Sequence, residues 1–223
     1  RITATHEGHK NNRVDGRKPT SAYLPRFRNV YRQETNFLRG YAAGFGARKN
    51  MIYDTSGLGD DLFNNLKNTK QNDVWNVNSH MMGETIPKKS NQVTLDQSLV
   101  DPWGIPQLKV DVDYDDNDEK MLKDFFEEFS EMYTKAGFTN IKTSDNNSIP
   151  GNDIHEMGGV RMGHDSKTSL LNKWNQLHHC QNVFITDGAC MTSTSTQNPS
   201  LTYMAMTARA ANHAIKEMKK GNI

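Results

Sequence analysis

The chain has 223 residues, enough for one large or two small domains with a sizeable core. Lys and Arg number 27 and Asp and Glu number 26, so the near-zero net charge gives no indication of nucleic acid or an acidic membrane surface as a partner. No apolar run approaches the roughly 20 residues of a membrane span. Hydrophobic residues make up 35%, which predicts long loops or support from further chain. Cys180 and Cys190, the only two cysteines, make no disulfide framework and fix no compartment.

The first 50 residues are polar, and we expect irregular structure there. Gly40, Gly44 and Gly46 could be mistaken for a dinucleotide fingerprint, which requires G-x-G-x-x-G directly after a buried strand. Because their spacing differs, we interpret them as glycines in turns or in a close-packed strand. The sequence of residues 53–73 predicts a turn, a short helix and a loop.

Alternating apolar and polar residues predict three strands, at 75–81, 93–96 and 108–112. Gly, Pro and Asn residues separate these segments. Antiparallel pairing with one face in water fits the alternation.

Residues 116–136 carry apolar side chains at helical spacing, and Gly137 follows as a helix-ending glycine. This pattern predicts a helix that packs on the sheet, with a return strand beginning at 138–141. The apolar run 183–186 lacks alternation, which predicts a strand buried on both faces. A final helix is expected from Pro199 to about Lys219, with Asn198 as its N-cap.

Oxidation of an alcohol by hydride transfer requires a base for the hydroxyl proton and a cofactor that accepts the hydride, since no side chain does so. His155 is the candidate base, because a neutral imidazole titrates near working pH. Gly158 and Gly159 follow it and permit tight turns near a ligand. The alternative is a loop histidine held by one hydrogen bond, and this is preferred if His155 is considered alone.

Asn198 could hydrogen-bond the substrate oxygen beside His155, or it could be an ordinary N-cap. The helix start favours negative charge through its free N–H groups and its dipole. A reduced flavin is such an anion, so a helix start aimed at its pyrimidine edge would favour hydride transfer.

Gly188 and Ala189 follow the apolar run and could offer backbone N–H groups to a flavin or a pyrophosphate. The alternative is that Asp187 caps a turn at the strand end. His178-His-Cys180 has no zinc spacing, so we reject a metal site. The serines of the C-terminal third lack a G-x-S-x-G elbow, which leaves a serine hydrolase with little support.

Three segments together resemble the C-terminal signature of the glucose-methanol-choline (GMC) family of flavin-dependent alcohol oxidoreductases. They are His155-Glu-Met-Gly-Gly-Val-Arg-Met-Gly163, Asn182-Val-Phe-Ile-Thr-Asp-Gly-Ala189 and Gln197-Asn-Pro-Ser-Leu-Thr202. The resemblance implies FAD as cofactor and catalytic roles for His155 and Asn198. It also implies cofactor contacts from Asp187, Gly188, Ala189, Asn198, Pro199 and Thr202.

Pro25-Arg-Phe-Arg-Asn29 and Phe37-Leu-Arg-Gly40 most resemble the branch that includes bacterial gluconate and glucoside dehydrogenases. Members of that branch act on sugars and pass electrons to a cytochrome or quinone-type acceptor. The resemblance therefore implies a sugar or polyol substrate, and it suggests a small subunit or cytochrome as partner and a periplasmic location.

The implied fold is mixed α+β and α/β. An antiparallel substrate-domain sheet with a covering helix is joined to the last strand and helix of a Rossmann-like FAD domain. We expect an irregular joining segment at 1–74, a substrate-binding domain at 75–154, and the active-site loop with the C-terminal strand and helix at 155–223.

The family's N-terminal G-x-G-x-x-G unit is absent from this sequence, which begins at Arg1 without a Met or an apolar leader. We therefore expect a C-terminal fragment, inactive alone, whose first partner is the N-terminal FAD-binding half of the same protein. The predicted reaction is FAD-dependent oxidation of a CH–OH group in a sugar, glycoside or sugar acid. The alternative is a non-catalytic carbohydrate-binding or assembly module with the same fold. An NAD-dependent dehydrogenase lacks a nucleotide fingerprint here.

Overall fold

The computed structural model describes residues 1–7, 21–52, 54–67, 70–145, 149 and 154–223. The chain divides into two compact units. The first comprises Arg1–Gly83 with Glu119–Asn147, and the second comprises Glu84–Asp118 with Ser148–Ile223. Each unit is therefore built from two separate stretches of chain. The expected domains at 1–74, 75–154 and 155–223 stay a prediction.

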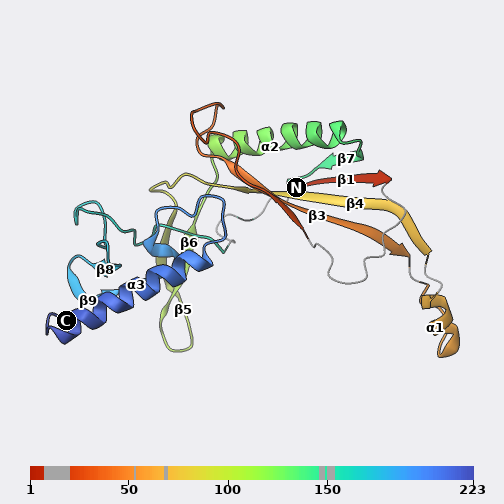
Figure 1. Ribbon diagram of the computed structural model, residues 1–223. Coiled ribbons are helices and arrows are strands. Elements are labelled where there is room, and N and C mark those ends of the chain that lie inside the picture. The colour runs from red at the N-terminus through yellow and green to blue at the C-terminus, as the bar shows by residue number, and fades with distance from the viewer. Residues whose placement is uncertain (8–20, 53, 68–69, 146–148, 150–153) are drawn as a thin grey trace. The chain divides into compact units, whose positions relative to one another are not determined.

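The first unit contains an antiparallel sheet of five strands in the order β2-β3-β4-β1-β7 (Figure 1). The strands are β1 (Ile2–Glu7), β2 (Ala22–Leu24), β3 (Tyr41–Ile52), β4 (Lys70–Gly83) and β7 (Thr139–Thr143). The strand expected at 75–81 is confirmed within β4, and the expected return strand is β7. The expectation of irregular structure in residues 1–50 is wrong, because β1, β2 and most of β3 lie there.

Small residues explain why β3 was missed. Tyr41, Ala43 and Phe45 face the core, but Ala42 is also fully buried and Gly44 has no side chain, so the alternation is hidden. A Cβ at Gly44 would lie 2.4 Å from the imidazole of His80 on β4, which confirms a close-packed strand glycine. The short helix α1 (Asp60–Lys67) follows β3, as expected.

Helix α2 (Asp116–Lys135) covers one face of this sheet (Figure 1). Met121, Phe125, Phe129 and Tyr133 recur at every fourth position and are all buried. They pack against buried residues of the strands, namely Ile2, Ala4, Tyr41, Ala43 and Val77. Gly137 adopts φ +81 just beyond the helix, as a helix-ending glycine does. The predicted covering helix is therefore confirmed.

The second unit contains a hairpin of β5 (Gln92–Val100) and β6 (Pro106–Asp111), which pair with each other in an antiparallel sheet. The strands expected at 93–96 and 108–112 are thus confirmed, and among the described residues their sheet consists of these two strands. The Asp101 carboxylate closes the turn by accepting from the N–H groups of Trp103 and Ile105, both at 2.9 Å.

The rest of the second unit contains β8 (Gln176–Leu177), β9 (Cys180–Phe184), the short 3-10 helix η1 (Gly188–Cys190) and α3 (Ser200–Lys219). The expectation of a strand at 183–186 buried on both faces is wrong. The strand β9 pairs with the short β8, and Val183 is 36% exposed in the described chain. Within the described residues, we find no helix with the length and apolar character needed to cross a membrane.

Candidate active site

The loop that carries His155 runs beside the η1 turn. The N–H of Val160 donates to the Ala189 carbonyl at 2.9 Å, and the N–H of Met162 donates to the Cys190 carbonyl at 3.0 Å. His155 is half-buried and lies five residues before the first of these bonds. Backbone pairing therefore fixes this loop against the turn that follows β9.

Two glycines allow this close packing. Gly158 has φ +87, a left-handed conformation that residues other than glycine rarely adopt. A Cβ at Gly188 would lie 2.7 Å from the carbonyl oxygen of Glu156 and 3.0 Å from the hydroxyl of Tyr203. The residue after His155, the η1 turn and α3 thus converge on Gly188.

Tyr203 joins the helix α3 to the same loop. Its N–H donates to the Pro199 carbonyl at 3.0 Å, which places it one turn into the helix, and its hydroxyl donates to the sulfur of Met157 at 3.6 Å. Partial burial raises the pKa of Tyr203, so the phenol remains a neutral donor. The His155 loop therefore contacts the first turn of α3.

Asp187 caps the turn at the end of the strand, which was the alternative to a cofactor contact. Its Oδ1 accepts from the Ala189 N–H at 2.9 Å at the start of η1. The Ala189 N–H is thus used inside the turn, and the space beside Gly188 is filled by the protein's own atoms. The expected contacts of Asp187, Gly188 and Ala189 with a cofactor stay a prediction.

The start of α3 differs from the expectation. The helix begins at Ser200 and the Pro199 carbonyl accepts its first hydrogen bond, so Pro199 holds the N-cap position and the prediction of Asn198 as N-cap is wrong. Asn198 is exposed one residue further out, and Thr202 is exposed in the first turn. That turn contains no acidic residue, so the positive end of the helix dipole is not neutralised by its own side chains.

Asn175 and Arg209, behind the site, were not selected as site residues from the sequence. Asn175 is fully buried with φ +62; its Nδ2 donates to the Ile185 carbonyl at 3.0 Å, and its Oδ1 accepts from Arg209 at 3.0 Å. These two hydrogen bonds of Asn175, called the Asn175 clasp, join the chain after β9 to α3. Buried Cys190 packs 3.8 Å from the Met206 sulfur, and desolvation raises the pKa of its thiol. The tendency of Asn to adopt a left-handed conformation is the only sequence signal for this clasp.

Three further hydrogen bonds involve serine and histidine side chains of the second unit. Ser193 donates a short hydrogen bond to the carboxylate of Glu84, and the N–H of Ser195 donates to the Ser193 hydroxyl at 2.7 Å. His178 lies 3.2 Å from the Ser169 hydroxyl. In the part of the chain that the structure describes, no three His, Cys, Asp or Glu side chains gather as a metal site would require.

Comparisons with known proteins show the family to which the chain is similar. The family model of the GMC oxidoreductase C-terminal domain matches residues 87–207, more than half of the chain. The 2-methyl-1,2-propanediol dehydrogenase of Mycolicibacterium austroafricanum is 31% identical over 134 residues, which are 60% of this chain and 24% of the relative. The fructose dehydrogenase large subunit of Gluconobacter japonicus is 30% identical over 138 residues, 62% of this chain and 25% of the relative.

A third relative is an oxidase. The paromamine 6'-oxidase of Streptomyces fradiae is 28% identical over 161 residues, 72% of this chain and 28% of the relative. The chain thus spans about a quarter of the length of the curated relatives that it matches. The match to the family model covers the His155 loop, the η1 turn and the start of α3, and on this basis the chain belongs to the GMC oxidoreductase family.

Proposed function

We propose that this chain is the C-terminal part of an FAD-dependent oxidoreductase that oxidises a CH–OH group of a sugar, glycoside or sugar acid. GMC enzymes are in general FAD-dependent oxidoreductases of CH–OH groups, and the relatives are named as dehydrogenases and oxidases. The observation that carries the proposal is the contact at Gly188, where the residue after His155 meets the first turn of α3.

The start of α3 fits a flavin better than the η1 turn does. Asn198 and Thr202 are exposed there, no acidic side chain occupies the first turn, and Pro199 fixes the chain where the helix begins. A ligand that gains negative charge would be favoured by these free N–H groups. At η1, the Ala189 N–H is already bonded to Asp187, so we assign Asp187, Gly188 and Ala189 the role of holding the His155 loop in place.

The chemistry that FAD supplies when bound is acceptance of the hydride. In the proposal, a ring nitrogen of His155 accepts the proton of the substrate hydroxyl, and Asn198 hydrogen-bonds the same oxygen. Asn198 is exposed and is not the N-cap of α3, so its side chain is not used to cap the helix. This supports its assignment as the partner of the substrate oxygen. General base catalysis of this kind contributes about 10²–10⁴ in rate.

The proposed partner for this chain is the N-terminal FAD-binding half of the same protein. Apolar side chains are exposed along the β5–β6 hairpin and on α3: Val93 60%, Leu95 54%, Trp103 83%, Leu108 70%, Leu201 78% and Met204 68%. Apolar exposure of this kind marks an interaction surface. The relatives are about four times longer than the region they share with this chain, so the remaining part of such a chain is the natural cover. We expect the chain alone to be inactive.

A further partner is suggested by one relative, which is named as a large subunit. We include a small subunit or a cytochrome as electron acceptor in the proposal for the whole enzyme. Purification of the full-length protein under native conditions, followed by identification of co-eluting chains, would show whether such a subunit is present.

The test of the proposed reaction is flavin reduction in the full-length protein. Its visible spectrum is recorded, and aldoses, glycosides, polyols and aldonic acids are then added without oxygen. We expect one class to bleach the flavin band in the blue region. A protein that never carries flavin, even when FAD is supplied, would contradict the proposal and leave a carbohydrate-binding or assembly module.

A further inference from the structure

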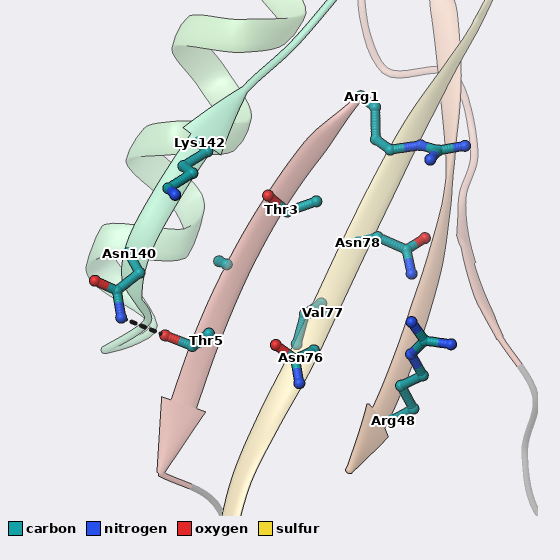
Figure 2. A pocket seen from close by; sticks show the side chains of 10 residues that line it. Arg1, Thr3, Thr5, Arg48, Asn76, Val77, Asn78, Asn140 and Lys142 are labelled. Carbon is teal, nitrogen blue, oxygen red and sulfur yellow. Dashed lines mark hydrogen bonds between the residues drawn. The ribbon is translucent and has the colours of Figure 1, made fainter. Parts of the chain in front are cut away.

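Two methionines join the His155 loop to helix α3. The sulfur of Met157 accepts a hydrogen bond from the Tyr203 hydroxyl at 3.6 Å, and the sulfur of Met162 accepts one from the Arg209 guanidinium at 3.7 Å. In contrast, the groove on the open face of the five-stranded sheet has no sulfur atom among its described lining residues (Figure 2). The junction between the loop and α3 therefore contains thioethers, the group that oxidation converts to a sulfoxide.

Met157 lies in closely packed surroundings beside Gly188. Its terminal methyl group is 3.3 Å from the position that a Cβ at Gly188 would take, and the Tyr203 hydroxyl is 3.0 Å from the same position. The carbonyl oxygen of Glu156 is 2.7 Å from it. The end of the Met157 side chain therefore lies between the η1 turn and α3, where an added atom has little room.

Met162 has different surroundings. Its hydrogen bond with Arg209 lies in an exposed position, and the guanidinium has a second acceptor in the Asn175 Oδ1 at 3.0 Å. A thioether sulfur is a weak acceptor, so the oxygen of a sulfoxide would bind the guanidinium more strongly. Oxidation of Met162 should therefore keep its contact with α3.

Oxidation of Met157 is not accommodated in the same way. An O–H···O hydrogen bond requires about 2.5–3.0 Å between its oxygen atoms. An oxygen bonded to the Met157 sulfur and directed at the Tyr203 hydroxyl would have to fit between two atoms that are 3.6 Å apart. The distance left is shorter than a covalent bond to sulfur, so the two side chains must move apart. Because Met157 is two residues beyond His155, this movement displaces the loop that carries the candidate base.

We propose that Met157 is a site of oxidative modification that controls the position of the His155 loop. Hydrogen peroxide transfers one oxygen atom to the Met157 sulfur, which loses two electrons; the O–O bond breaks, and the second oxygen leaves as water with both protons. The product, methionine sulfoxide, is polar and is returned to the thioether by methionine sulfoxide reductases. The effect on catalysis rests on the proposed function, whereas the modification and the loop displacement do not.

The test is treatment of the full-length protein with graded amounts of hydrogen peroxide, followed by removal of the peroxide and by peptide mass spectrometry. Anaerobic flavin reduction is then compared with the untreated rate of the same protein. We expect complete oxidation of Met157 to slow reduction by about tenfold to hundredfold, because a displacement of about 1 Å can cost about 10² in rate. Methionine sulfoxide reductases A and B, which act on one sulfoxide epimer each, should restore the rate.

Two leucine variants separate Met157 from other oxidisable groups. Met157→Leu retains a similar side-chain volume but forms no sulfoxide, so its own rate should withstand the same treatment. Met218→Leu is the matched control, because Met218 is 63% exposed in the last turn of α3, and this variant should lose activity as the natural chain does. Equal sensitivity of the two variants would overturn the proposal. So would an unchanged rate after complete oxidation of Met157, or a Met157 that stays reduced when Met218 in the natural chain is fully oxidised.

A second readout does not depend on the flavin. The N–H groups of Val160 and Met162 donate to carbonyls of the η1 turn, so hydrogen–deuterium exchange at these two amides reports whether the loop stays on that turn. Exchange should become faster once Met157 is oxidised and slow again after reductase treatment. Faster exchange in a protein whose flavin no substrate reduces would retain the modification site and remove the reaction. Flavin reduction and amide exchange that both survive complete oxidation of Met157 would retain the reaction and remove the modification site.

Discussion

At the scale of single residues, Gly188 is the point where the candidate active site is assembled. The nearest atom to a Cβ at this position is the backbone carbonyl oxygen of Glu156, at 2.7 Å, and backbone cannot turn aside as a flexible side chain can. The next is the hydroxyl of Tyr203 at 3.0 Å. Any side chain here must therefore push the His155 loop away from the η1 turn.

Gly188→Ala should for this reason destabilise the site. We expect the melting temperature of the full-length protein to fall, with a cost of about 1–3 kcal/mol typical of overpacking, and flavin reduction to slow. Gly159→Ala is the matched control, since a Cβ there would meet nothing within 4 Å. Thermal unfolding and reduction rates of both variants are the measurement. If the two variants behaved alike, the close packing of the loop against η1 would be refuted.

At the scale of elements, the connection between β2 and β3 is held to α2 by two carboxylates, those of Asp124 and Glu128, and Glu128 pairs with the Arg28 guanidinium at 2.5 Å. Asp124 accepts two bonds from the Arg28 guanidinium, both at 3.0 Å, and one from the Tyr41 hydroxyl at 2.7 Å. Burial raises the pKa of Tyr41 and keeps its phenol a donor. Asn29 adopts φ +52 beside Arg28, and its amide donates to the carbonyls of Phe37 and Arg39 at 2.9 Å. The Pro25–Asn29 segment therefore has a structural role in the first unit.

Asp124→Ala should lower the free energy of unfolding by about 1–3 kcal/mol, because the buried Tyr41 phenol loses its acceptor and the partly buried Arg28 guanidinium keeps only Glu128. Glu127→Ala is the control on the same helix: its exposed pair with Lys123 spans 3.9 Å and should contribute less than about 0.5 kcal/mol. Urea unfolding, followed by the intrinsic tryptophan fluorescence, measures the free energy of unfolding of both variants. Equal urea midpoints for the two variants would exclude this role of Asp124.

At the scale of the whole molecule, the chain combines a sheet covered by a helix with a second unit that carries the family's sequence signature. The first unit has its own core under α2, and the hairpin and α3 of the second unit expose large apolar side chains. The proposed partner, the N-terminal half of the same protein, would cover these side chains. The chain spans about a quarter of the length of the relatives that it matches.

The elements predictable from the sequence are those with an uninterrupted period. Helix α2 follows from Phe125 and Phe129, the end of α2 follows from Gly137, and strands β4, β5 and β6 follow from alternation. The strand β3 could not be found, because Ala42 and Gly44 hide its alternation. The division into units was also out of reach, since it depends on β5 pairing with β6 instead of β4.

The candidate site was predictable at the level of segments. The motifs placed the His155 loop, the η1 turn and the start of α3 in one site, and the backbone bonds of Val160 and Met162 join the first two. Their details depend on tertiary contacts that have no local signature. The positions of Tyr203 and Asn175 are of this kind, and so is the shift of the N-cap from Asn198 to Pro199.

The most direct test of the account is the rate of anaerobic flavin reduction in the full-length protein with His155→Ala, measured by stopped-flow absorbance. His164→Ala, an exposed histidine one residue beyond Gly163, is the control. If His155 is the base, its loss should slow reduction by about 10²–10⁴ while the flavin content and the rate of the His164 variant stay unchanged. An unchanged reduction rate in the His155 variant would contradict the assignment of this loop as the catalytic one.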